Sequence, residues 1–126
     1  MLIYAFFHSL VHIALVVLVA IIFGLTPFTI IIAFLATAIV DLDHFQLWLK
    51  EGIRGYLFLR TITEFGKPRS YAFHKFYVLI PAAICSIFLS HHFLFLSIAC
   101  TSITFHLLWD LLEDVAIFKM GIMHWL

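Results

Sequence analysis

Four long apolar stretches, separated by shorter polar segments, dominate this sequence of 126 residues. Each is close to the roughly 20 apolar residues that an α-helix needs to cross a bilayer. We expect helices over residues 2–23, 28–49, 71–89 and 93–118. Residues 50–70 mix apolar and basic side chains, as interfacial amphipathic segments do. The sequence therefore predicts a single transmembrane domain: an all-α integral membrane four-helix bundle with an interfacial amphipathic segment between its second and third helices.

The composition supports a membrane protein over a soluble one. Hydrophobic residues make up 65% of the chain and charged residues 11%, whereas soluble domains are about half apolar and a quarter charged. A small soluble domain could not bury so much apolar surface, because its surface is large relative to its volume. Seven cations balance seven anions, so nothing indicates nucleic acid as a partner. The expected partner of the apolar surface is the lipid bilayer.

The positions of the basic residues predict the orientation. Six of them flank or lie within the central polar segment: Lys50, Arg54, Arg60, Lys67, Arg69 and Lys75. Lys119 follows the fourth stretch, and the turns at residues 24–27 and 90–92 carry no Lys or Arg. By the positive-inside rule, this distribution predicts the orientation of a multi-pass membrane protein. The loop 50–70 and both termini are expected in the cytoplasm.

Ionisable side chains interrupt the apolar stretches, at a cost of at least ~2.5 kcal/mol each for charged groups. These are His8, His12, Asp41, Asp43, His44, His74, His106 and Asp110. In antiparallel helices that rise about 1.5 Å per residue, all of them fall roughly 3–13 Å below the cytoplasmic boundary. We therefore expect one polar cluster at one end of the bundle.

The spacing within this set favours a metal site. His8 and His12 are four residues apart, as are His106 and Asp110, while Asp41 and His44 are three apart, so each pair shares a helix face. Paired donors one turn apart bind zinc in H-E-x-x-H helices, and imidazole with carboxylate suits Zn, Mn or Fe. The predicted ligands are His8, His12, Asp41, His44, His106 and Asp110. The set is large enough to leave open one ion or two ions with a bridging carboxylate, as in many hydrolytic sites.

Other polar residues have different expected roles. Asp43 or His74 would move protons as general base or acid, beside a metal that turns water into a nucleophile. Lys67, Arg69 and Lys75 lie near the mouth of the site and could hold a phosphate. Glu113 and Asp114 are expected to be solvated at the end of the fourth helix, although Asp114 is one turn after Asp110 and could support it.

At these residues the chain resembles the inner-membrane metal-dependent hydrolases of bacteria and archaea, especially a short, uncharacterised branch. The matching pieces are H-S-L-V-H at 8–12, V-D-L-D-H at 40–44, F-H-K-F-Y at 73–77 and F-H-L-L-W-D at 105–110. The resemblance implies a multi-helix, multi-pass fold in the cell inner (plasma) membrane, with a metal site and hydrolytic activity on phosphoesters. Larger members carry a second His soon after the position of His74, and residues 75–83 contain none.

We therefore expect a metal-dependent hydrolase that acts on a phosphoester or lipid head group at the cytoplasmic leaflet. One alternative is a non-catalytic metal-binding membrane protein. A second is a small structural subunit of a membrane complex, in which the Asp and His residues form an ionic staple between helices. An ion pathway is disfavoured because the opposite half of the predicted bundle has no ionisable residue.

Overall fold

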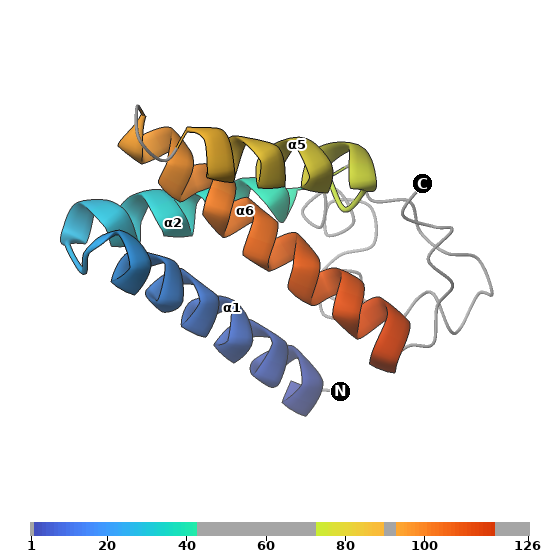
Figure 1. The fold of residues 1–126 in the computed structure, drawn as a ribbon. Coiled ribbons are helices and arrows are strands. Elements are labelled where there is room, and N and C mark those ends of the chain that lie inside the picture. The colour runs from blue at the N-terminus through green and yellow to red at the C-terminus, as the bar shows by residue number, and fades with distance from the viewer. Residues whose placement is uncertain (1, 43–72, 90–92, 118–126) are drawn as a thin grey trace.

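The computed structural model of the chain describes residues 2–42, 73–89 and 93–117, with side chains from Phe7 to Ala116 within those ranges. This part of the chain is all-helical and has no strand. Its elements are α1 (Leu2–Phe23), α2 (Pro27–Val40), α5 (Phe76–Phe88), α6 (Leu94–Leu112) and the short π-helix η1 (Glu113–Ile117) (Figure 1). The predicted all-α class is confirmed for the described residues.

Two helices have shorter bounds than the apolar stretches that contain them. α2 ends at Val40, where Asp41 forms the C-cap, although the apolar pattern continues to residue 49. α5 begins at Phe76 rather than at residue 71, because Lys75 has an extended backbone with φ −140° and ψ 153°. Residues 43–72, which include the predicted amphipathic segment, lie outside the described residues.

The turn between α1 and α2 has a defined chemical basis. Gly24 has a φ of 93°, a left-handed conformation that glycine adopts without a steric penalty. Thr26 then caps α2: its side chain accepts from the Thr29 backbone N–H, and the Thr29 side chain accepts from the Thr26 N–H. Pro27 occupies the first turn, where its missing N–H costs nothing. These residues reverse the chain so that α2 packs back along α1.

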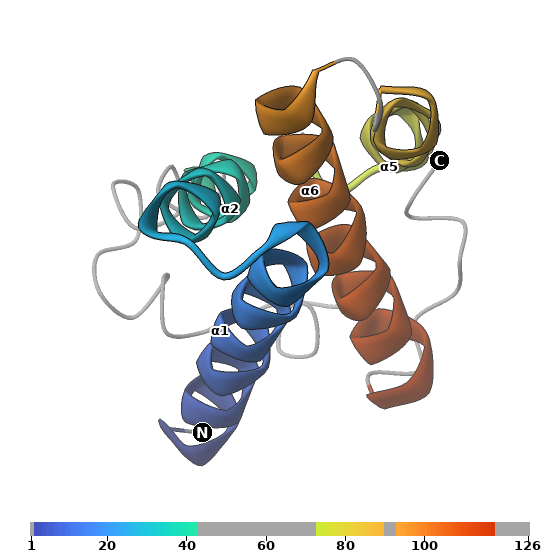
Figure 2. The same ribbon diagram turned by 60° about the vertical axis from the view of Figure 1, so that its left-hand side comes forward.

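α6 is the central helix of the bundle. It packs against α1, α2 and α5, as Figure 2 shows from the side. Small buried residues, including Ala33 in α2 and Ser97 in α6, allow close helix approach. One apolar core joins Val16, Val19, Ala33 and Ile98 from α1, α2 and α6. A second joins Val40, Leu79 and Leu107 from α2, α5 and α6.

The outer surface of the described helices is rich in large apolar side chains. Examples are Ile21, Ile31 and Ile87, which are 61%, 57% and 70% exposed. By length and composition, one run among the described residues, Leu94–Ala116, could cross a membrane. The apolar helices Phe7–Phe23, Pro27–Val40 and Phe76–Phe88 are shorter than that criterion requires.

Candidate metal centre

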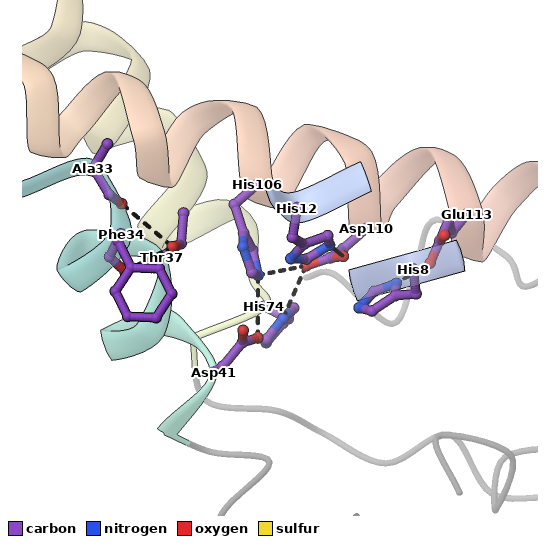
Figure 3. A network of polar contacts seen from close by, with 10 residues as sticks. All are labelled: His8, His12, Ala33, Phe34, Thr37, Asp41, His74, His106, Asp110 and Glu113. Carbon is purple, nitrogen blue, oxygen red and sulfur yellow. Dashed lines mark hydrogen bonds and ion pairs between the residues drawn. The ribbon is translucent and has the colours of Figure 1, made fainter. Parts of the chain in front are cut away.

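Imidazole and carboxylate side chains from four separate segments meet at the end of the bundle opposite the α1–α2 turn (Figure 3). α1 contributes His8 and His12, and the C-cap of α2 contributes Asp41. His74 lies in the bend just before α5, and α6 contributes His106 and Asp110. Of the eight ionisable positions singled out in the sequence, the structure brings together these six: His8, His12, Asp41, His74, His106 and Asp110.

His106 lies at the centre of this cluster and is fully buried. Its Nε2 atom is 3.1 Å from Oδ2 of Asp110 and 3.2 Å from Oδ1 of Asp41. The His106 ring meets the His12 ring edge-on, with centroids 4.0 Å apart. α6 thus presents an imidazole that faces carboxylates from two different helices.

Asp110 is the second central residue, and its two carboxylate oxygens face different partners. Oδ1 lies 3.3 Å from Nε2 of His12, whereas Oδ2 lies 3.0 Å from Nε2 of His74 and 3.1 Å from Nε2 of His106. The residue is 8% exposed. A carboxylate so deeply buried is costly unless positive charge compensates it.

The distances between these donor atoms also suit a shared cation. The N···O distances between the imidazole nitrogens of His12, His74 and His106 and the oxygens of Asp110 are 3.0–3.3 Å. Two donors that each lie about 2.0–2.1 Å from a tetrahedral zinc ion are about 3.3 Å apart. The observed separations therefore match those of neighbouring ligands around one ion.

Three overlapping groups of residues have ligand atoms within 4.8 Å of one another and can hold a metal ion. The first is His8, His12 and Asp110; the second is His12, Asp41 and His106; the third is His74, His106 and Asp110. Mixed imidazole and carboxylate donors suit Zn, Mn or Fe. This donor set is suited to each of these three ions.

His74 belongs to the donor cluster itself. Sequence analysis assigned it to proton transfer, but its buried Nε2 lies 3.0 Å from Asp110 Oδ2, in one group with His106 and Asp110. This position makes His74 a candidate ligand as well as a candidate proton carrier.

Glu113 is a component of the site that the sequence reading missed. Instead of being solvated, it is 6% exposed, and its Oε2 lies 2.8 Å from Nδ1 of His8. The expectation of solvation was wrong for Glu113 because it considered only the position at the end of the helix and not the packing of α1 against that end. Residues 106, 110 and 113 follow the i, i+4, i+7 spacing of one helix face, and this signal could have identified Glu113. It is also the first residue of η1, and π-helical turns are frequent at functional sites.

The remaining predicted site residues are placed as follows. Lys75 is the half-buried N-cap residue of α5, directly after His74. Asp114 is half-buried in η1, next to Glu113. Asp43, His44, Lys67 and Arg69 lie outside the described residues, so their predicted roles as proton carrier, ligand and phosphate contacts stay predictions.

Three of the donor residues are buried: His74, His106 and Asp110 are 7%, 0% and 8% exposed. Val40 directly precedes Asp41 and Leu107 directly follows His106, and both belong to the core formed with Leu79. An apolar surrounding lowers the local dielectric constant and strengthens every charge interaction inside it. The buried part of the site therefore has limited contact with water, whereas the Asp41 side chain is 37% exposed.

A scan against models of protein families finds no match to this chain. Searches of curated proteins and of solved structures likewise find no similar protein.

Proposed function

We propose that this protein is a membrane-embedded metal-binding protein that hydrolyses a phosphoester or a lipid head group at the cytoplasmic leaflet. The single observation that carries the metal site is the convergence of His74, His106 and Asp110, which are all buried and whose ligand atoms lie within 4.8 Å of one another. The wider proposal also draws on the apolar outer surface and on the depth of the site.

A four-span bundle is supported by the distribution of polar and apolar side chains. Polar residues such as Thr37, Ser97 and Ser102 are buried, whereas many large apolar residues on all four helices are exposed. Soluble monomers rarely expose contiguous apolar patches larger than a few hundred Å². Lipid is the surrounding that makes such a surface favourable. The basic residues of the central segment then put the donor end of the bundle in the cytoplasmic leaflet.

A structural staple is the main rival to a metal site, and the contact geometry disfavours it. Direct Asp–His pairs gain most when an imidazole N–H points at the carboxylate oxygen. Nε2 of His106 instead lies 3.2 Å from Asp41 and 3.1 Å from Asp110, and a single N–H cannot point at both carboxylates. A cation at the point where these atoms converge would satisfy all of them together.

Hydrolysis is the chemistry that such a donor set best supports. A divalent cation supplies Lewis acidity, which makes water nucleophilic near neutral pH and polarises a phosphoryl oxygen. The residues of this chain would hold that cation, orient it and exclude bulk water. Asp41 is the most exposed residue of the donor cluster, with 37% of its side chain accessible to solvent. A head group could approach the site from this side. Lys75 follows His74 directly and could contact a phosphate there.

Elemental analysis of the detergent-purified protein tests the metal site. We expect bound Zn, Mn or Fe in the wild-type chain and its loss in a variant that combines His106→Ala with Asp110→Ala. Asp114→Asn is the matched control, because it removes a neighbouring acid that belongs to none of the three donor groups. A wild-type protein that stays metal-free after reconstitution with each ion would leave the cluster as a staple.

A phosphoester screen with the metal-loaded protein tests the hydrolase. Turnover should disappear with metal removal and return with metal addition, and Lys75→Gln should raise KM while leaving bound metal unchanged. Stoichiometric metal without turnover on phosphoesters or phospholipid vesicles would instead favour the non-catalytic alternative.

A further inference from the structure

The two faces of Asp110 divide the donor cluster into two parts. His74, just before α5, and His106, in α6, both lie near Oδ2. His12 lies near Oδ1, and its ring is tilted by 40° against the His8 ring, at a centroid distance of 4.1 Å within α1. The group of His74, His106 and Asp110 and the group of His8, His12 and Asp110 have only Asp110 in common.

We propose that the protein holds two divalent cations bridged by Asp110, and that Glu113 positions His8 as a ligand of the second ion. The inference rests on the proposed metal site and deepens it. We call the group of His74, His106 and Asp110 the α6 site, and the group of His8, His12 and Asp110 the α1 site. A carboxylate that offers one oxygen to each ion is a common bridge between metals about 3.5–4 Å apart.

Glu113 acts through His8 rather than as a ligand. Its Oε2 is 2.8 Å from Nδ1 of His8, but Glu113 belongs to none of the three donor groups. A metal-bound histidine commonly donates its other ring N–H to a carboxylate, which fixes the ring orientation and raises the basicity of the coordinating nitrogen. In this arrangement the Nδ1–H of His8 donates to Glu113, and Nε2 of His8 coordinates the ion.

The burial of Glu113 supports this role. Its side chain is 7% exposed, and that of His8 is 15% exposed. An acid so far from water needs a compensating partner, and an imidazole that is polarised by a bound cation is a strong one. The change from α-helix to π-helix at Glu113 marks the place where α6 meets the α1 site. His12 also belongs to a donor group with Asp41 and His106, so it lies where the α1 site and the α6 site meet.

Titration of the metal-free protein with Mn²⁺ tests the inference by stoichiometry and by electron paramagnetic resonance. For the wild-type chain we expect about two equivalents and a spin-coupled signal, as bridged ions this close produce. His8→Ala should retain one equivalent and lose the coupling. Glu113→Gln should keep the α6 site but weaken binding at the α1 site by about 10–100-fold. Asp114→Asn is the control and should leave both equivalents and the coupling intact.

The possible failures are distinguishable. A wild-type protein that binds one equivalent at saturation, with an uncoupled spectrum, overturns the two-ion inference and leaves the proposed metal protein intact. Two equivalents with the same affinities and coupling in wild type and Glu113→Gln overturn the positioning role of Glu113. A wild-type protein that binds no metal overturns the proposed function itself. The wild-type measurements need no variant to fold.

Discussion

His106 and Asp110 lie one turn apart in α6, with Nε2 and Oδ2 separated by 3.1 Å. The central helix of the bundle therefore carries both residues around which the other donors gather. His12, Asp41 and His74 reach this pair from three other segments. Any substitution in the pair should affect the whole cluster, and the expected results differ for a metal site and a staple.

Asp110→Asn should lower metal affinity by at least ~100-fold, because it removes the charge of the shared carboxylate while keeping its size. Substitutions of groups that only support ligands already cost 10–100-fold. Competition with a fluorescent chelator measures the affinity, and circular dichroism checks that helicity is retained. Unchanged affinity would remove Asp110 from the metal site.

Metal removal should destabilise the wild-type protein. A ligand that binds only the folded state at 100 times its Kd stabilises by about 2.7 kcal/mol. We expect the melting temperature in detergent to fall after chelation and to recover when metal is restored. The variant that combines His106→Ala with Asp110→Ala should melt at the same temperature with and without metal. A chelator-insensitive wild-type melt would point to a staple.

Topology can be measured by labelling single cysteines in intact cells. In a background that replaces the free Cys85 and Cys100 by Ala, Leu25→Cys should react with a membrane-impermeant maleimide. Leu25 is 65% exposed in the turn between α1 and α2. Lys75→Cys should react only after permeabilisation, because the positive-inside rule puts that end in the cytoplasm. The reverse pattern would invert the proposed orientation.

Ala33→Leu should destabilise the bundle by about 1–3 kcal/mol, the usual cost of overpacking a tight core. Ala33 is fully buried in the core with Val16, Val19 and Ile98. Ala38→Leu is the matched control, since Ala38 is exposed on the same helix. Thermal melts compare the two variants. Equal stability would mean that α1, α2 and α6 are not closely packed at Ala33.

The all-helical class and the shared end of the ionisable residues could be predicted from the sequence alone. Helical spacing is a local property, so His106 and Asp110 had to share a face once α6 formed. Short turns force neighbouring helices to run antiparallel, which puts the start of α1 beside the end of α6. The end of α2 at Val40 could not be predicted, because the apolar pattern continues beyond it.

Only the tertiary structure decided which side chains meet. The rotation of each helix about its own axis is set by packing across the bundle, through small residues such as Ala33 and Ser97. That packing turns the His8 ring toward Glu113, 105 residues away in the chain. It also divides the two oxygens of Asp110 between His12 on one side and His74 on the other. Sequence periodicity places residues on a helix face, but contacts between faces depend on how the helices pack together.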